Sequence, residues 1–308
     1  MLAKMISARN SPIPCPPLIA LAFAASVAIL TAAEPAYTPV PDFPQLPTDL
    51  ELGAATGVEM DREGNLLVFH RNKTPILVLT PEGKFLRSFG ADFFDSAHGL
   101  RCDPEGAIWT TDNKNHTVIK FSPVGEALLT LGKRDVEGAD TSHFNKPADI
   151  AFAKNGNIFI ADGYGNSRVV RTNPKGEFEF AWGEKGSGKS QFDLPHAIRI
   201  DSKGLVYVGD RENDRIQVFD QNGKFIRLFG GFAPFGMHIT PDDRLFIADG
   251  RANEVLVMTL EGEILHRFGS KGSKSGQFNM PHGIAVDKDG AIYVAEVNNK
   301  RIQKFVLK

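Results

Sequence analysis

Short runs of alternating apolar and polar residues recur along the chain, separated by turns rich in Asp, Asn and Gly. Residues 281–305, PHGIAVDKDGAIYVAEVNNKRIQKF, show the unit: an apolar run, the turn DKDG, a second apolar run, a polar loop and a third run. A period of two is typical of β-strands with one buried face, and Asp and Gly between two such runs are typical of a tight turn. The pattern predicts three antiparallel strands in this segment.

The unit recurs at intervals of roughly 40 to 50 residues, a range typical of propellers and other repeat arrays. In five of the copies a fourth run follows and ends in glycine, as in GKFLRSFG and GKFIRLFG. In the sixth copy the sequence ends at Lys308, after the third run. The six copies begin at Ala55, Ala97, Pro147, Pro195, Pro234 and Pro281.

Six repeats of four strands predict an all-β fold, the six-bladed β-propeller, in which radial repetition leaves only short, protected edges. The sixth repeat lacks a fourth strand, so the ring needs one from elsewhere in the chain. Residues 48–53, TDLELG, precede the first copy and end in glycine as the fourth runs do. We therefore expect this N-terminal segment to form the outer strand of the last blade and to pair its open edge. An open solenoid is the alternative architecture.

The N-terminal residues differ from the rest of the chain. Lys4 and Arg9 precede the apolar run LIALAFAASVAILTAA, residues 18–33, and small residues at its end are compatible with cleavage before Glu34. An uncleaved membrane anchor is the alternative. Cleavage would make the mature protein secreted or periplasmic. The predicted organisation is a signal peptide at 1–33, a Pro-rich linker at 34–47 and a propeller domain at 48–308.

The composition is that of a soluble globular protein, with 308 residues of which 42% are hydrophobic and 23% charged. The chain has 35 basic and 37 acidic residues; Lys4 and Arg9 are the only charged residues of the predicted signal peptide, so the remainder has 33 and 37 and a formal charge of −4. Without a basic cluster, nucleic acid is not an expected partner, nor is a membrane once the signal is cleaved. Cys102 is the one cysteine of that remainder, so no internal disulfide is expected.

Histidine occupies one position of the repeat in alternate copies. The first strand of each blade is the innermost, so this position should lie at the mouth of the central channel. Alternate blades are about 120° apart, and three imidazoles would then point inward with near three-fold symmetry. Three histidines and an open position form the ligand set of a catalytic zinc site, although imidazole also suits iron, copper and nickel. In chain order, the six residues at this position are Thr56, His98, Ala148, His196, Phe235 and His282.

A lone histidine at a strand start is commonly a hydrogen-bonding edge residue, but three in one register favour a metal site. The loops after the second strands should share the same rim, because the chain reverses at each turn. Arg71 and Arg211 occupy one register of these loops in copies one and four, and Tyr164 lies in the loop of copy three. Such residues are often solvated or packed. Beside a metal, however, guanidinium groups suit a substrate that carries a carboxylate.

Five motifs point to a known family: FNKPADIAF (144–152), DGYGNSRVV (162–170), LPHAI (194–198), DRENDRIQVF (210–219) and NMPHGI (279–284). The repeats resemble NHL repeats, and the chain from about Asn65 to Lys308 resembles the catalytic core of the peptidyl-α-hydroxyglycine α-amidating lyases. The resemblance implies a zinc-dependent six-bladed propeller that splits a peptidyl-α-hydroxyglycine into a peptide amide and glyoxylate.

The resemblance also implies roles for single residues. Zinc would act as a Lewis acid on the substrate hydroxyl, with Tyr164 as the base. An unperturbed phenol is a poor base at neutral pH, so we assign Arg71 the task of lowering the pKa of Tyr164 and Arg211 that of holding the substrate carboxylate. Met280 would line the pocket. The implied zinc ligands are His98, His196 and His282.

The chain departs from the family at three positions. A structural calcium in the family uses an aspartate directly after the last zinc histidine, and Gly283 stands there, so we do not expect the calcium. Gly165 and Val218 occupy positions where the family has disulfide cysteines.

Two other functions remain open at this stage. One is a propeller that binds a peptide, protein or glycan without catalysis. The other is a lactonase-type hydrolase, which would need carboxylate ligands for a hard cation, and the channel-mouth positions offer none. We expect a monomer acting on a small-molecule or peptide substrate with a carboxylate.

Overall fold

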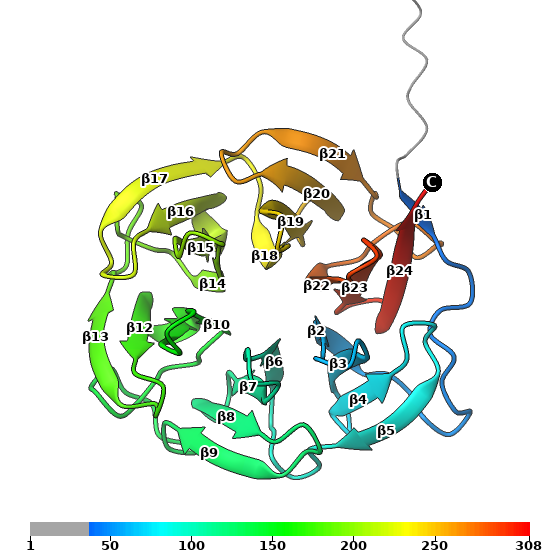
Figure 1. The fold of residues 1–308 in the computed structure, drawn as a ribbon, viewed down its shortest axis with the longest axis horizontal. Coiled ribbons are helices and arrows are strands. Elements are labelled where there is room, and N and C mark those ends of the chain that lie inside the picture. Colours follow the sequence, from blue (N-terminus) through cyan, green and yellow to red (C-terminus); the bar gives the residue numbers. More distant parts are fainter. Residues whose placement is uncertain (1–36) are drawn as a thin grey trace, which may run out of the picture. The chain divides into compact units, whose positions relative to one another are not determined.

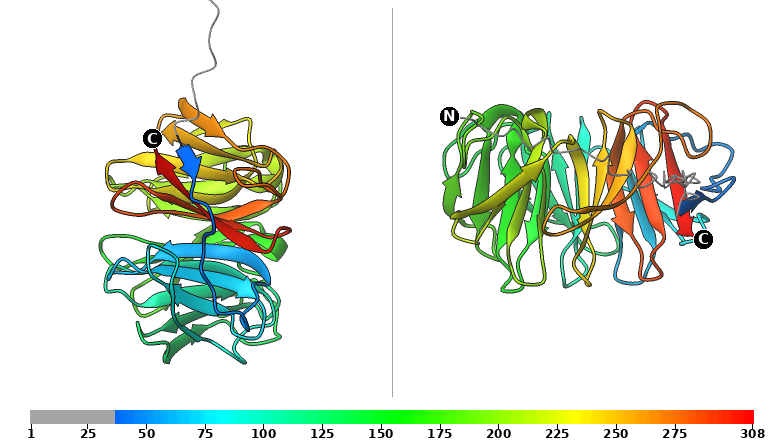
Figure 2. Two further views of the ribbon diagram at one scale, coloured as in Figure 1. Left: turned by 90° about the vertical axis from the view of Figure 1, so that its right-hand side faces the viewer. Right: turned by 90° about the horizontal axis from the view of Figure 1, so that it is seen from above.

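The protein is represented by a computed structural model, which describes residues 37–308. These residues form six four-stranded antiparallel sheets around a central axis, so the predicted six-bladed β-propeller is confirmed (Figure 1). Figure 2 shows the same ring in two further views, each turned by 90° from that of Figure 1, in which the sheets stand side by side as blades. No helix within residues 37–308 has the length and apolar character needed to cross a membrane. The predicted signal peptide, 1–33, lies outside the described residues.

The first three blades follow the repeats. Blade one consists of β2 (Ala54–Met60), β3 (Leu66–Arg71), β4 (Ile76–Leu79) and β5 (Phe85–Phe89). Blade two consists of β6 (Ala97–Cys102), β7 (Ile108–Asp112), β8 (Thr117–Phe121) and β9 (Ala127–Leu131). Blade three consists of β10 (Asp149–Phe152), β11 (Ile158–Asp162), the single-turn helix α1 (Gly163–Asn166), β12 (Arg168–Thr172) and β13 (Phe178–Trp182).

The remaining blades complete the ring. Blade four consists of β14 (Pro195–Ile200), β15 (Val206–Asp210), the 3₁₀ turn η1 (Arg211–Asn213), β16 (Arg215–Phe219) and β17 (Phe225–Gly230). Blade five consists of β18 (Pro234–Ile239), β19 (Arg244–Asp249), β20 (Glu254–Thr259) and β21 (Ile264–Phe268). Blade six consists of β22 (Pro281–Val286), β23 (Ile292–Glu296), β24 (Arg301–Leu307) and β1 (Tyr37–Pro39).

The turn between the first two strands is set by its aspartate. In blade six, the Asp287 Oδ1 atom accepts hydrogen bonds from the backbone N–H groups of Asp289 (3.0 Å) and Ala291 (2.9 Å). Gly290 has a φ of 83°, which a side chain would disfavour. An aspartate that bonds the backbone in this way closes the turn locally and fixes the register of the two strands. Asp61, Asp103 and Asp201 make the same pair of bonds in other blades.

The hydrophobic core lies between neighbouring blades. Between blades five and six, for example, Phe246 and Val255 pack with Phe278 and Phe305. Such aromatic side chains are at most 2% exposed, and full burial of one contributes about 1.5–3 kcal/mol of transfer free energy. Packing of this kind on both faces of each blade holds the inner strands at fixed positions around the channel.

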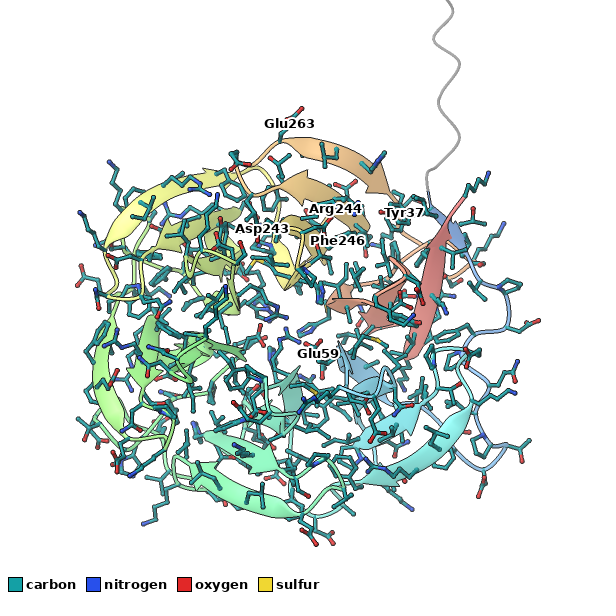
Figure 3. The ribbon with its side chains drawn as sticks, in the orientation of Figure 1. Tyr37, Glu59, Asp243, Arg244, Phe246 and Glu263 are labelled. Carbon is teal, nitrogen blue, oxygen red and sulfur yellow. The ribbon has the colours of Figure 1, made fainter. Side chains whose placement is uncertain are left out.

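The strand that closes the ring differs from the prediction. β1 pairs with β24, with Tyr37 opposite Leu307, and residues 48–53 form no strand. The predicted segment lies too far along the chain: the ring of Tyr37 is 5% exposed and stacks 5.2 Å from that of Phe268 in β21, whereas Leu50 and Leu52 pack on the core without forming a strand. Figure 3 places Tyr37 at this junction. Within the predicted linker, Phe43 and Leu46 also pack on the core, so its described part belongs to the propeller.

Candidate metal centre and active site

Three histidine rings meet at one mouth of the channel. His98, His196 and His282 are the second residues of the inner strands β6, β14 and β22. The ring centroids of every pair are 4.8 Å apart, and the ring planes cross at 72° to 76°. The predicted three-fold arrangement is therefore present. Among residues 37–308, these are the one group of three or more His, Cys, Asp or Glu side chains whose ligand atoms all lie within 4.8 Å of one another.

The blades without a histidine orient the imidazoles. The Nδ1 atom of each ring lies 2.7 Å from the backbone carbonyl oxygen of the channel-mouth residue in the next blade, which is Ala148, Phe235 or Thr56. A carbonyl oxygen only accepts hydrogen bonds, so each Nδ1 carries the proton and each Nε2 carries a lone pair instead. Fixing the tautomer through a second partner is how proteins prepare histidine as a metal ligand.

Burial keeps the three imidazoles neutral. It lowers the pKa of His98 to about 3, and Arg71 and Arg211 add a smaller effect of the same sign. Burial also lowers the pKa values of His196 and His282 well below the ordinary range of histidine. Three neutral imidazoles with converging lone pairs are the donor set that zinc takes in a catalytic site. The residues present therefore fit a zinc-type cation.

Tyr164 and Arg211 lie on two short turns with a common scaffold. α1 follows Asp162 and η1 follows Asp210, and both carboxylates are fully buried. Each carboxylate accepts hydrogen bonds from the preceding loop, from an asparagine on the turn and from an arginine that begins the next strand. For Asp162 the donors are Asn145 N, Asn166 Nδ2 and Arg168 Nε. For Asp210 they are Asp193 N, Asn213 Nδ2 and Arg215 Nε.

The Tyr164 hydroxyl lies directly at the histidines. Its oxygen is 3.0 Å from the Nε2 atoms of both His98 and His196. The Nη1 atom of Arg211 donates to the same oxygen at 3.2 Å. Burial raises the pKa of Tyr164, and Arg211 opposes this more strongly than Arg71 does. The phenol is therefore positioned to exchange a proton with a group bound at the histidines.

The two arginines have different surroundings, and the expected neighbour of Tyr164 was wrong. Arg211, not Arg71, contacts the phenol, because η1 in blade four stands next to blade three, whereas Arg71 ends β3 in blade one. The Nε atom of Arg71 donates to the carbonyl oxygen of Ala97 at 3.1 Å. Among the described residues, its two terminal nitrogens have no hydrogen-bond partner. Arg71 is exposed, so its guanidinium is open to a ligand.

Met280 lies on the same rim, two residues before His282. Its backbone is in the left-handed region, with a φ of 57°, and its N–H donates to Asn253 Oδ1 at 2.9 Å. The side chain is half-buried. Its role as a pocket residue stays a prediction.

A buried ion cluster lies deeper in the channel. The Asp149 Oδ2 atom accepts hydrogen bonds from Arg101 Nη2 at 2.9 Å and Arg199 Nη1 at 2.8 Å, and the exposed fraction of these three side chains is 3% to 10%. Burial alone would raise the pKa of Asp149, but the two arginines hold it below its ordinary value. Glu59, 3.7 Å from Arg101, is marked beside the central channel in Figure 3.

This arrangement does not fit the calcium site that the resemblance to the amidating lyases implies. A Cβ atom at Gly283 would lie 2.8 Å from the carbonyl oxygen of Thr56, so an aspartate has no room there. Asp149, the nearby carboxylate, is already bonded by two guanidinium groups. The cavity beneath the histidines has a volume of about 10 Å³, room for one water molecule. Calcium needs six to eight oxygen ligands, which this space cannot supply.

Two features of the site were missed in the sequence. The repeat alignment placed Phe235 at the channel mouth but gave it no role, because an aromatic residue at a strand start is usually core; its ring centroid lies 5.5 Å from that of His196 and 6.0 Å from that of His282. The ion cluster had a detectable signal. Arg101 and Arg199 stand three residues after His98 and His196, in one register of the repeat.

Comparison with known proteins gives related sequences. The NHL repeat profile matches residues 94–121, 144–171, 192–219 and 278–305. "Peptidyl-alpha-hydroxyglycine alpha-amidating lyase 1" of Drosophila melanogaster is 33% identical, covering 84% of this chain and 58% of that protein. "NHL repeat-containing protein 3" of Homo sapiens is 33% identical, covering 76% and 73%. "Peptidyl-glycine alpha-amidating monooxygenase B" of Xenopus laevis is 32% identical, and the chain spans only 34% of its length.

A solved structure of streptogramin B lyase superposes with a TM-score of 0.64 at 18% identity, covering 88% of this chain and 97% of that one. At this identity the likeness concerns the fold alone. Relatives named as amidating lyases, at about 30% identity over most of the chain, support a lyase.

Proposed function

This chain belongs to the family of NHL-repeat six-bladed propellers, and on that basis we propose that it is a zinc-dependent carbon–nitrogen lyase. The substrate is a peptidyl-α-hydroxyglycine or a similar carbinolamide, and the products are an amide and glyoxylate. One observation carries the proposal: three imidazoles, each with Nδ1 fixed on a backbone carbonyl, present Nε2 to a common point beside the Tyr164 hydroxyl.

The reaction needs one proton to move. The hydroxyl of the carbinolamide loses its proton, the carbon–oxygen bond becomes a carbonyl, the carbon–nitrogen bond breaks, and the amide nitrogen gains a proton. His98, His196 and His282 would hold a divalent cation, which when bound would supply Lewis acidity at the hydroxyl. Tyr164, 3.0 Å from two of these rings, accepts the hydroxyl proton and returns it to the leaving nitrogen.

The arginines divide two tasks between them. Arg211 donates to the Tyr164 oxygen, so its positive charge favours the phenolate that the proton transfer needs. Its Nε atom is bonded to Glu212 at 2.8 Å, which holds the guanidinium beside the phenol. Arg71 has both terminal nitrogens available, and a planar guanidinium binds a carboxylate with two parallel hydrogen bonds. Arg71 therefore receives the carboxylate that leaves as part of glyoxylate.

The same proposal includes the cell compartment and the partners. The apolar run at 18–33, after Lys4 and Arg9, supports export of the protein to the periplasm or the cell exterior. The partner is a small molecule or peptide with a terminal carboxylate, and the protein acts as a monomer.

Release of glyoxylate from an N-acyl-α-hydroxyglycine peptide by the zinc-loaded protein tests the proposal. Tyr164→Phe should lower kcat by about 10²- to 10⁴-fold, the usual contribution of a general base, while the bound zinc stays unchanged. His196→Ala should lose the metal. His143→Ala is the control, because His143 lies in a loop against the exposed Asp140 and should change neither quantity.

Two results would refute parts of the proposal. A purified protein that binds no transition metal is not this lyase. Neither is a protein that binds zinc and releases no glyoxylate, and this second result would favour a propeller that binds a ligand without catalysis. Full turnover by Tyr164→Phe would remove the tyrosine from the proton transfer.

A further inference from the structure

The three gaps between the histidines differ in chemistry. The gap in blade three, between His98 and His196, holds the Tyr164 hydroxyl. The gap in blade one, between His282 and His98, has the small residue Thr56 at the channel mouth. The Thr56 hydroxyl is buried and bonds backbone carbonyls of Phe69 and Ala97 at 3.4 Å and 3.3 Å. No large side chain therefore stands at the mouth in blade one, and the exposed guanidinium of Arg71 lies on the rim above it.

The third gap, in blade five, is lined by an aromatic ring. Phe235 stands between His196 and His282, with ring centroids 5.5 Å and 6.0 Å away. Its side chain is half-buried, so part of the ring faces the open mouth. The guanidinium carbon of Arg211 lies 4.6 Å from the ring centre, a cation–π contact that covers part of the ring. Of the six channel-mouth residues, Phe235 alone is large and apolar.

A glycine makes room for this ring. Gly250 follows β19, at the loop register where blades one and four carry Arg71 and Arg211. A Cβ atom at Gly250 would lie 2.5 Å from the Phe235 ring, closer than any real contact, so a side chain there would force the ring to move. The position of the ring is thus set by the loop of its own blade and by Arg211.

We propose that Phe235 is a specificity-determining residue: its exposed edge packs against the acyl group on the amide side of the substrate and favours flat, apolar acyl groups. This inference rests on the proposed lyase function. The reacting carbon carries a hydroxyl, a carboxylate and an acylated nitrogen. The hydroxyl belongs beside Tyr164 and the carboxylate beside Arg71. The nitrogen must stay within reach of Tyr164 to be protonated, so the acyl group that it carries is left with the gap in blade five.

The chemistry of that gap matches an acyl group. Apolar area removed from water contributes roughly 25 cal/mol per Å², and aromatic pairs add further stabilisation through their edge-to-face or offset geometry. The amide is also the product that must leave, and a half-exposed wall lets the rest of a peptide chain continue into solvent.

The test compares two substrates that differ only in the acyl group, N-benzoyl- and N-acetyl-α-hydroxyglycine. The measured quantity is the ratio of their kcat/KM values with the zinc-loaded protein. Phe235→Leu should lower the benzoyl-to-acetyl ratio by about three- to tenfold, the range expected from loss of one aromatic contact. Gly250→Ala should lower the ratio in the same direction, because it displaces the ring without changing its chemistry. Phe93→Leu, at an exposed phenylalanine in the loop before β6, is the matched control and should leave the ratio unchanged.

The outcomes separate this inference from the lyase function. If the unaltered protein cleaves both substrates and Phe235→Leu keeps the ratio, Phe235 does not read the acyl group and the lyase function stands. If the unaltered protein cleaves neither, the lyase function fails, and binding is measured instead with mandelate and lactate, two α-hydroxy acids with a phenyl and a methyl group. If Phe235→Leu changes the ratio of the two Kd values, Phe235 does contact the apolar group of the ligand. If the ratio is unchanged, the inference is overturned.

Discussion

The hydrogen bonds of the three imidazoles explain why histidine appears only in alternate blades. Each ring needs a backbone carbonyl from the next blade, and a carbonyl is available whatever side chain that blade carries. The intervening positions are therefore free of this requirement. They hold a threonine, an alanine and a phenylalanine, which give each gap between the histidines its own chemistry.

At the residue scale, substitutions of the two rim arginines should change different kinetic constants. Arg71→Met should raise KM by about 10- to 100-fold and change kcat little, because charged hydrogen bonds to a substrate carboxylate contribute about 1.5–3 kcal/mol. Arg211→Met should instead lower kcat, because its partner is the Tyr164 hydroxyl. Steady-state glyoxylate release at varied substrate concentration separates the two effects.

A substrate whose carboxylate is replaced by a methyl ester provides the control for Arg71. The unaltered protein and Arg71→Met should then have similar KM values. An equal loss with the acid and with the ester would contradict the assignment of the carboxylate to Arg71.

At the scale of elements, one strand–turn–strand scaffold recurs both in blades that carry a candidate site residue and in a blade that does not. In blades three and four, a buried aspartate, an asparagine and an arginine hold turns that carry Tyr164 and Arg211. Blade six has the same scaffold with Glu296 as the carboxylate, bonded to Asn299 and Arg301, and there the side chain of Asn298 on the turn bonds Asn279 instead of a histidine. The scaffold is therefore structural, and function depends on the residue placed directly after the carboxylate or one further on.

The closing strand offers an element-scale prediction. Tyr37→Ala should lower the free energy of unfolding by about 2–4 kcal/mol, because it removes a buried aromatic ring from the junction of blades five and six. Asp49→Ala, at an exposed position of the segment first expected to close the ring, should change it by less than about 0.5 kcal/mol. Urea unfolding followed by circular dichroism gives both values. Equal effects of the two substitutions would mean that Tyr37–Pro39 is not the strand on which closure depends.

At the scale of the whole molecule, buried neutral histidines should make the metal-free protein sensitive to mild acid. Burial lowers the pKa of His70 to about 4 and that of His98 to about 3, and it lowers those of His196 and His282 as well. The unfolded chain protonates these groups near pH 6.5, whereas the folded chain does not. The contribution of these neutral histidines to the free energy of unfolding is therefore complete above pH 6.5. It is lost as the pH falls, by about 1.4 kcal/mol per pH unit for each histidine.

Urea midpoints of the metal-free protein at pH 7.0, 6.0 and 5.0 measure this loss. His70→Gln provides the matched comparison, because His70 lies outside the metal site and is fully buried. The slope of the free energy of unfolding against pH should be smaller in this variant by the contribution of one histidine. Identical slopes would show that His70 does not titrate with folding.

The propeller and the cluster of three histidines could be predicted from the sequence because both follow the register of the repeat. His98, His196 and His282 could be aligned without any knowledge of distance, since equivalent positions of equivalent blades must meet on the axis. The closing strand could not be found this way, because three residues, Tyr37–Pro39, carry too short a pattern. The pairing of Arg211 with Tyr164 depends on two turns in adjacent blades, and no local pattern encodes a contact between blades.

The ion cluster of Arg101, Asp149 and Arg199 closes the channel beneath the histidines. It separates the small cavity beneath the histidines from a cavity of about 540 Å³ at the opposite mouth, and Arg101 lines both. Under the proposed function, substrate and products would therefore pass through the one mouth on the histidine side. In that reaction glyoxylate would keep the carboxylate assigned to Arg71, so the order in which the two products leave this mouth would determine when the next substrate can enter.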